Sequence, residues 1–160
     1  MSLFFDDMKV GDESELGAHL FTKEAIIAFA ILYDPQPFHL SDEGAKASIY
    51  GSLIASGWHT AAMCMRFIVD HRERQRAASA ARGEALPKMG VSPGVRELRW
   101  PAPVRPGDRI IYSSRIESLG ATKRPQWGLV TSRAIGVNQN GAEVFSMVGD
   151  VLWERLPALS

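Results

Sequence analysis

The sequence predicts an α+β protein in which the helices and an antiparallel sheet occupy separate parts of the chain. In the first half, apolar residues recur at helical spacing from Lys23 onward. After Pro87 this period vanishes, and three strand-like runs follow, separated by turn residues. Helices that are segregated from a run of strands are typical of α+β folds rather than of a wound parallel sheet. We therefore expect about five strands that curl around one long apolar helix.

The first elements are an expected strand and an expected helix. Residues 14–21 alternate weakly between apolar and polar types and end at Thr22, which is a good helix N-cap. The helix predicted over 23–33 ends before Pro35, because a residue that precedes proline is pushed out of the α region. The apolar residues Ile26, Ile27, Ala30 and Ile31 lie on one face of this expected helix.

The longest helical pattern follows Ser56-Gly57 and continues to Val69. Its apolar residues wrap most of the circumference, which predicts a helix enclosed by the rest of the fold. A shorter helix is expected over Asp42 to Ala47, with Ser41 as its cap. The segment Arg72 to Lys88 fits either a continued helix or a surface loop. We interpret its basic residues as a solvated surface rather than as contacts to a phosphate.

The second half contains the expected sheet. Strand-like runs cover Arg109 to Leu119, Trp127 to Val137 and Glu143 to Trp153. The Asn140-Gly141 pair between the last two runs is a strong hairpin signal. A further run, Val91 to Trp100, precedes the proline-rich turn of residues 101–108.

Composition narrows the class of protein. The 160 residues suit one domain over 1–160, and 46% hydrophobic with 22% charged residues is an ordinary globular composition. Eighteen basic and 18 acidic residues cancel, which gives no support for a nucleic-acid partner. The single cysteine, Cys64, excludes an internal disulfide and suits a reducing compartment. No secretory signal or membrane-spanning run is visible, so we expect a soluble cytoplasmic protein with no membrane partner.

Asp34 and His39 are the first candidate for chemistry. The prolines at positions 35 and 37 fix two φ angles and stop the preceding helix, so the chain must leave it in a stiff turn. That turn holds a carboxylate and an imidazole at a set separation. Such a pair, sharing one water, can take a proton from water and deliver one to carbon. The alternative is that Asp34 only caps a turn and His39 only packs by its ring.

The second candidate is the glycine that opens the long helix. Gly57 would let a ligand approach free backbone N–H groups, where the helix dipole favours negative charge. An enolate-like thioester oxygen is such a charge. The alternative is that Ser56 caps the helix and Gly57 permits tight packing. No close cluster of histidine, cysteine and carboxylate is present in the sequence, so we expect no metal.

At these residues the sequence resembles the MaoC-like dehydratases, relatives of the R-specific enoyl-CoA hydratases. The segment Tyr33 to His39 matches their Asp-x-(Asn/Gln)-Pro-x-His motif, and Gly51 to His59 matches the glycine-led start of their central helix. Val91 to Asp108 is similar to the strand and Pro-Gly-Asp turn that follow in that family. Some relatives carry a serine near the position of Met65. The resemblance implies a hotdog fold, in which the sheet wraps the central helix, and a homodimer.

The resemblance also implies a reaction and a set of roles. The reaction is the reversible hydration of a trans-2-enoyl-CoA to a (3R)-3-hydroxyacyl-CoA, catalysed by a hydro-lyase. Asp34 and His39 would activate the water, and the Gly57 N–H would meet the thioester oxygen. Gln36 and Ser56 are expected to contact the substrate. The partner is an acyl-CoA thioester, and no separate cofactor is expected because CoA is part of the substrate.

Two other functions share the expected fold. A hotdog thioesterase would direct water at the thioester carbonyl, which needs no acid–base histidine five residues after the carboxylate. A non-catalytic acyl-CoA-binding or accessory subunit would keep the fold without the chemistry. The presence of both Asp34 and His39 argues against each of them.

Overall fold

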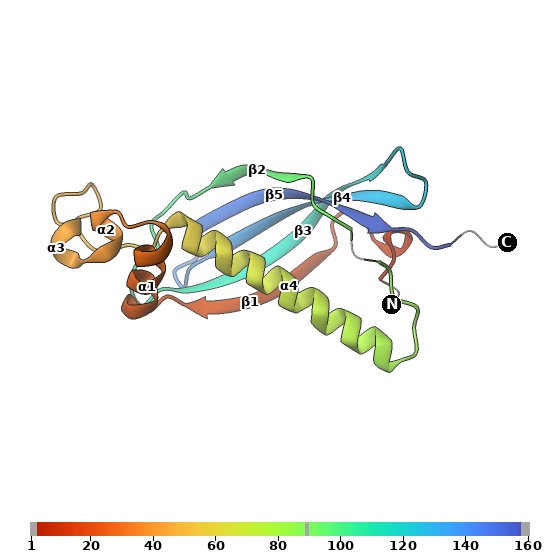
Figure 1. The fold of residues 1–160 in the computed structure, drawn as a ribbon, viewed down its shortest axis with the longest axis horizontal. Helices are drawn as coiled ribbons and strands as arrows, with labels where there is room; N and C mark the ends of the chain where they lie inside the picture. The colour runs from red at the N-terminus through yellow and green to blue at the C-terminus, as the bar shows by residue number, and fades with distance from the viewer. Residues whose placement is uncertain (1–2, 89, 158–160) are drawn as a thin grey trace.

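The computed structural model describes residues 3–88 and 90–157 of the chain. A short 3-10 turn, η1, precedes the first strand, and four helices and four further strands follow (Figure 1). In chain order the elements are η1 (Phe5–Asp7), β1 (Glu13–Leu20), α1 (Lys23–Tyr33), α2 (Pro37–Leu40), α3 (Asp42–Ala45), α4 (Gly57–Ala81), β2 (Gly94–Arg99), β3 (Arg109–Ala121), β4 (Trp127–Val137) and β5 (Glu143–Glu154).

The five strands form one antiparallel sheet in the order β1-β3-β4-β5-β2, so β1 and β2 are its edges. The long helix α4 lies along one face of this sheet, and α1, α2 and α3 gather at one end (Figure 1). This is the hotdog arrangement that the sequence predicts. The edge strand β2 pairs irregularly with β5, with a register shift between Arg96 and Arg99 and a positive φ of 52° at Glu97.

Most of the expected elements are confirmed. Thr22 caps α1 by accepting a hydrogen bond from the Ala25 N–H at 3.2 Å, and β4 covers the residues expected. The β4–β5 hairpin turns at Gly141, whose φ of 79° favours glycine. The helix expected over Asp42 to Ala47 ends earlier, at Ala45. The open question at Arg72 to Lys88 is answered by α4, which continues to Ala81 before the chain forms a loop.

The expectation that α4 is enclosed on all sides is wrong. Trp58 is 57% exposed, and Met65 and Val69 are each 46% exposed. A five-stranded sheet covers one face of a helix, so the opposite flank of α4 keeps its apolar side chains in contact with solvent in the single chain. The apolar face of α1 is also only partly covered, because Ile31 is 61% exposed.

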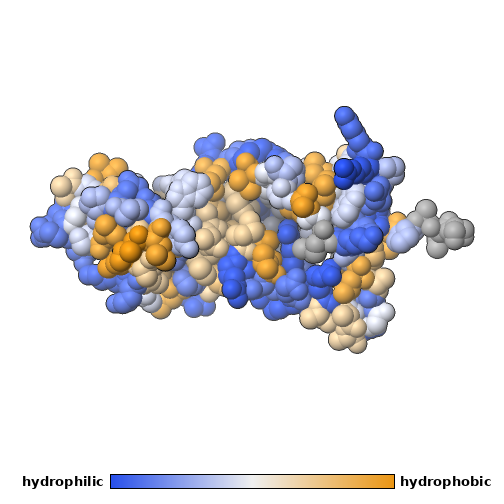
Figure 2. Space-filling model, viewed as in Figure 1, coloured by the Kyte–Doolittle hydropathy of each residue, from blue (hydrophilic) through white to orange (hydrophobic). Residues whose placement is uncertain are grey.

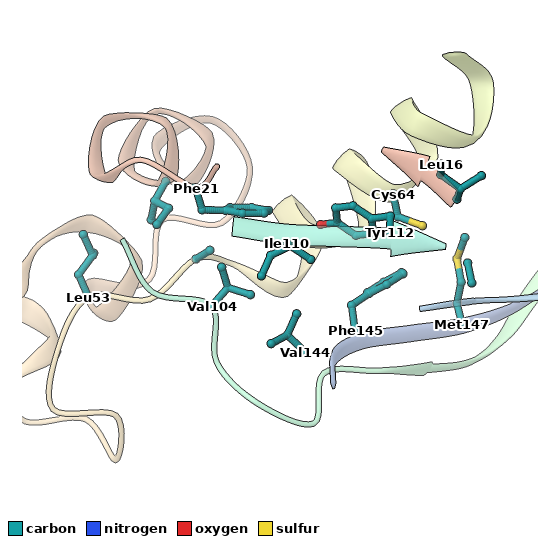
Figure 3. Packing of buried hydrophobic residues seen from close by; sticks show 13 residues of the cluster. Leu16, Phe21, Leu53, Cys64, Val104, Ile110, Tyr112, Val144, Phe145 and Met147 are labelled. Carbon is teal, nitrogen blue, oxygen red and sulfur yellow. The ribbon is translucent and has the colours of Figure 1, made fainter. Parts of the chain in front are cut away.

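The core lies between the N-terminal half of α4 and the sheet (Figure 3). Ile110, Tyr112 and Phe145 from the strands are fully buried there and share one cluster with Cys64 of the helix. The Tyr112 hydroxyl donates to the Thr60 carbonyl oxygen at 3.1 Å, which satisfies the phenol inside the core. This packing fixes the start of α4 relative to the sheet.

The basic residues of the C-terminal half of α4 hold the helix in place, which differs from the solvated surface expected. Arg74 donates to the Leu16 carbonyl oxygen at 3.0 Å, and Arg76 donates to that of Pro87 at 2.7 Å. Arg72 lies over the Trp153 ring. None of the helices in the described ranges is both long and apolar enough to span a bilayer.

Candidate active site

The turn between α1 and α2 places Asp34 and His39. Asp34 is the C-cap of α1, and its N–H donates to the Ala30 carbonyl oxygen at 2.9 Å. Pro37 then opens α2 at its first turn, where its missing N–H costs nothing. The two prolines predict a turn after α1, and the structure places His39 in a one-turn helix within that segment.

The Asp34 carboxylate is held by three neighbours. Ser56 Oγ donates to its Oδ2 at 2.6 Å, and Gln36 Nε2 donates to its Oδ1 at 2.8 Å. His39 Nε2 lies 3.4 Å from the same Oδ2. Partial burial alone would raise the pKa of Asp34, but the hydrogen bonds from Ser56 and Gln36, together with His39, outweigh burial and hold this pKa below its usual value. The carboxylate is therefore ionised and fixed in direction.

The His39 ring is buried, with 5% of the residue exposed. Its Nδ1 lies 2.9 Å from the Ile54 carbonyl oxygen. A carbonyl oxygen can only accept, so Nδ1 carries the hydrogen, and this assignment leaves Nε2 facing Asp34. The edge of the Phe38 ring packs against the imidazole, with ring centroids 4.6 Å apart. The contacts to Ile54 and Phe38 orient the ring so that Nε2 faces the Asp34 carboxylate.

The N-terminus of α4 meets the same carboxylate. Ser56 caps the helix by accepting from the Trp58 N–H at 3.2 Å while its hydroxyl donates to Asp34. Within the described residues, the Gly57 N–H has no hydrogen-bond acceptor. It is therefore free to meet an anionic ligand oxygen at the positive end of the helix.

Trp100 is a site residue that the sequence reasoning missed. Its ring covers Gly57 so closely that a Cβ at this position would lie 2.5 Å from the indole. Trp100 Nε1 donates to Thr60 Oγ1 at 3.1 Å, and the same hydroxyl donates to the Gly57 carbonyl oxygen at 2.6 Å. The glycine is thus required by tight packing, which was one of the two alternatives. No local pattern marks Trp100, because it approaches Gly57 only after β2 has docked on the sheet.

These residues surround a cleft of about 410 Å³. Asp34, Gln36, His39 and Gly57 all line it, so the fold brings four of the five predicted site residues to one cavity. The fifth, Ser56, is fully buried behind the carboxylate that it holds. The aromatic side chains at this cleft are Phe38, Tyr50, Trp58 and Trp100.

His59 packs against aromatic side chains next to the cleft. Its ring stacks on Phe29 at a centroid distance of 4.5 Å, and the residue is 6% exposed. Burial, with a smaller effect from His19, lowers the pKa of His59 to about 4. It is therefore a neutral core histidine, and its buried Nδ1 has no hydrogen-bond partner among the described residues. In the described ranges, no group of three histidine, cysteine or carboxylate side chains is arranged to hold a metal ion.

Comparison with known proteins identifies the family. The sequence profile of the MaoC like domain matches residues 8–138, which is most of the chain. This chain belongs to the MaoC-like domain family. A solved structure of a MaoC-like dehydratase from Rhodospirillum rubrum is 37% identical, with a TM-score of 0.81 over 98% of this chain and 99% of that one.

Two curated relatives of this MaoC-like protein are hydro-lyases by name. One is a 3-hydroxybutyryl-CoA dehydratase from Methylorubrum extorquens, which is 28% identical over 76% of this chain and 69% of the relative. The other is an (R)-specific enoyl-CoA hydratase from Rhodospirillum rubrum, which is 25% identical over 76% of this chain and 74% of the relative. The enzyme class that the sequence predicts is thereby confirmed at the level of the family.

Proposed function

We propose that this MaoC-like protein catalyses the reversible hydration of a trans-2-enoyl-CoA to a (3R)-3-hydroxyacyl-CoA. The observation that carries the proposal is the facing pair in the cleft: Asp34 Oδ2 and His39 Nε2 are 3.4 Å apart. Each group is held by a further hydrogen bond: the Asp34 carboxylate accepts one from Ser56, and the His39 imidazole donates one to the Ile54 carbonyl oxygen. A water that contacts both atoms would be oriented by both of them.

The proposed step is balanced in atoms and charge. The water oxygen bonds to C3 of the enoyl group, and one water proton passes to the Asp34–His39 pair. The displaced π electrons form a bond between C2 and a proton from the same pair. Both additions occur on one face of the alkene because one pair serves both. The reverse sequence dehydrates the 3-hydroxyacyl-CoA.

The start of α4 supplies the second part of the proposed machinery. As C3 is attacked, negative charge develops on the thioester oxygen. The Gly57 N–H, which has no acceptor within the described residues, would donate to that oxygen at the positive end of the helix. Gln36 and Ser56 act through the carboxylate that they hold, and Gln36 also reaches the cleft. CoA enters as part of the substrate, and the scheme uses no other cofactor.

A homodimer of this single domain is part of the proposal. The apolar side chains of Trp58 and Met65 on α4, and of Val95 on the edge strand β2, are exposed in the single chain. Exposed apolar groups beside an unpaired edge favour association with a second copy. Figure 2 shows further apolar surface at the end of the molecule that α1, α2 and α3 form.

The test follows crotonyl-CoA hydration by loss of the enoyl absorbance, with thiol release measured in parallel. Wild type should consume the alkene without releasing thiol. His39→Ala should lower kcat/KM by about a hundredfold or more, because it removes one member of the proton-transferring pair. Asp42→Asn, an exposed acid on α3 that pairs with Lys23, is the matched control and should retain wild-type turnover.

Other outcomes would select other functions. Thiol release without alkene loss would make the protein a thioesterase. Binding of crotonyl-CoA with neither signal would make it an accessory subunit. Hydration that His39→Ala leaves unchanged would contradict the assignment of the site, although the reaction itself would stand.

A further inference from the structure

The ring of Trp100 lies flat against the backbone of Gly57. A Cβ at position 57 would be 2.5 Å from Cε2 of the indole, 2.7 Å from Cδ2 and 2.8 Å from Nε1. Cε2 carries no hydrogen and is bonded to three ring atoms, so an atom that is nearest to it approaches the face of the ring. Part of the Trp100 side chain is exposed and lines the cleft. The indole therefore contacts Gly57 and also borders the space in which a substrate would bind.

The indole N–H fixes the direction in which the Thr60 hydroxyl donates. An indole N–H can only donate, so Thr60 Oγ1, which accepts from Trp100 Nε1 at 3.1 Å, must direct its own hydrogen elsewhere. That hydrogen goes to the Gly57 carbonyl oxygen, at 2.6 Å. Because Thr60 is buried, solvent has little access to this hydroxyl. Trp100 thus acts on Gly57 through Thr60 as well as through its ring.

Thr60 contacts both peptide units that flank the Gly57 Cα. Its hydroxyl holds the Gly57 carbonyl in one unit. Its backbone N–H lies 3.4 Å from the Ser56 carbonyl oxygen, which belongs to the unit that carries the Gly57 N–H. A trans peptide is planar, so its C=O and N–H point in opposite directions. The direction of the Gly57 N–H therefore depends on how firmly these two carbonyls are held.

Thr60 is anchored in turn to the sheet. Its carbonyl oxygen accepts from the Tyr112 hydroxyl at 3.1 Å, and Tyr112 of β3 is fully buried. Trp100 approaches from another part of the sheet, because it directly follows β2. Residues from two separate parts of the sheet thus converge on Thr60 and, through it, on Gly57.

Gly57 needs this support because a glycine does not restrict its own backbone. The missing Cβ admits the Trp100 ring, but it also gives position 57 a wide range of φ and ψ. The helix itself holds this turn weakly, since the Ser56 carbonyl oxygen is shared between the His59 N–H at 3.0 Å and the Thr60 N–H. The ring of Trp100 and the Thr60 hydroxyl supply the restraint that glycine lacks.

We propose that Trp100 is a positioning residue that holds the Gly57 N–H toward the thioester oxygen, through its ring face and through the Thr60 hydroxyl. This inference rests on the role proposed for Gly57 in hydration. A hydrogen bond that strengthens as charge develops on the oxygen lowers the barrier most when its donor is already aligned. Loss of alignment should therefore lower kcat more than it raises KM.

The first test separates kcat from KM in the hydration of crotonyl-CoA. Trp100→Phe keeps an aromatic ring but removes the indole N–H, and Thr60→Val removes the hydroxyl with little change in side-chain volume. Each variant should lower kcat by about tenfold while KM changes by less than about twofold. Thr60→Ser keeps a hydroxyl and should retain about half or more of the wild-type kcat. The acidic limb of the pH profile should not move, because the partners of Asp34 are unchanged.

Matched controls remove the same groups elsewhere. Trp127 opens β4 at the end of the sheet away from α1 and α2, in what we call the distal half of the molecule (Figure 1). Thr131 is a buried threonine whose hydroxyl donates to Asp150. Neither Trp127 nor Thr131 lines the cleft, so Trp127→Phe and Thr131→Val should keep the wild-type kcat and KM. Urea unfolding checks that every variant is folded under the assay conditions.

The second test measures the Gly57 hydrogen bond without any reaction. Butyryl-CoA has the thioester but no double bond, so it cannot be hydrated. A hydrogen bond to the thioester oxygen weakens the C=O bond and lowers its infrared stretching frequency. With an isotope label at this carbonyl, the wild-type protein should lower the frequency relative to the free ligand. Trp100→Phe and Thr60→Val should each reverse part of that shift, whereas the two controls should not.

Three results would overturn the proposal. A higher KM with unchanged kcat in Trp100→Phe would mean that Trp100 only binds the substrate as a wall of the cleft. An unchanged carbonyl frequency in both Trp100→Phe and Thr60→Val would show that the Gly57 N–H keeps its direction without them. A loss of kcat in Thr60→Ser as large as that in Thr60→Val would assign the effect to packing instead of to the hydroxyl.

The proposed hydration and the positioning role fail separately. If the wild-type protein did not hydrate crotonyl-CoA, the proposed reaction would be contradicted. The butyryl-CoA measurement would still decide whether Trp100 directs the Gly57 N–H, because that measurement requires no turnover.

Discussion

Asp34 and His39, at the start of α4, differ from His71 and Arg72, in its second half, in how many polar partners they have. At the N-terminal half, Asp34 has partners in Ser56, Gln36 and His39, and His39 is fixed in turn by Ile54. At the C-terminal half, Arg72 and His71 face a cavity in which the described residues offer no acceptor within hydrogen-bond distance of the guanidinium or of Nε2.

This difference teaches how firmly each side chain is held before a ligand arrives. Side chains that already have partners are held in one geometry, which suits a reaction that tolerates little misplacement. Side chains without partners gain most when a ligand completes them, which suits binding. Three pairs of matched substitutions, one member in each half of the molecule, test whether the contrast is real.

The largest effect is expected when a carboxylate is removed from each half. Asp34→Asn should lower kcat/KM for crotonyl-CoA by about 10²–10⁴-fold, because the amide cannot accept a proton from water. Glu73→Gln makes the same chemical change at an exposed position in the distal half and should leave turnover unchanged. Initial-rate measurements on both variants check the contrast. A loss of less than about tenfold for Asp34→Asn would place the proton transfer on another group.

The next largest effect, on fold stability, is expected when alanine replaces one glycine in each half of the molecule. Gly57→Ala places a methyl group 2.5 Å from the Trp100 ring and should destabilise the fold by about 1–3 kcal/mol through overpacking. Gly149→Ala is the distal counterpart: its methyl group would meet only Val95, at 3.9 Å, and it should stabilise the fold by about 0.4–1 kcal/mol. Urea unfolding of both variants measures whether each substitution lowers or raises the free energy of unfolding. Equal changes in the free energy of unfolding would show that the two glycines are packed equally tightly.

The smallest effect concerns hydroxyl groups. Ser56→Ala removes a hydrogen bond that lowers the pKa of Asp34, so that pKa should rise. Because the carboxylate form is active, the acidic limb of the profile of kcat/KM against pH should move to higher pH. Turnover at neutral pH should fall by about tenfold, the cost of losing one bond to a charged group.

The control for this change is Ser79→Ala, which removes a buried hydroxyl from the distal half of the same helix, where it accepts from Arg82. For Ser79→Ala, the acidic limb of the profile of kcat/KM against pH should stay at the wild-type position. A shift in both variants would indicate a general loosening of α4 instead of a local effect on the carboxylate.

The features that could be predicted from the sequence are those that depend on residues close together in the chain. The two prolines stop α1 and hold Asp34 near His39 within one short segment. The Asn140-Gly141 hairpin, the Thr22 cap and the three long strands also depend on neighbours in the chain. For such features the residue types and their spacing carry the information directly.

The rest depends on contacts between distant segments. Nothing near position 100 indicates that its indole will cover Gly57, and nothing near position 72 indicates that Trp153 will lie beneath the guanidinium. The apolar pattern of α4 predicts burial on all sides, which is wrong, because periodicity shows which side chains are apolar and not how far one sheet can reach around a helix. The cavity of about 490 Å³ beneath the C-terminal half of α4 could not be predicted for the same reason, because residues of several different strands line it.

The single hydroxyl of Ser56 joins the cap of α4 to the carboxylate of Asp34. A protein engineer who exchanges this acid for another group therefore also alters the end of the helix that would polarise the thioester. Substitutions at positions 34 and 56 should be chosen together in any library that seeks a new reaction in this scaffold.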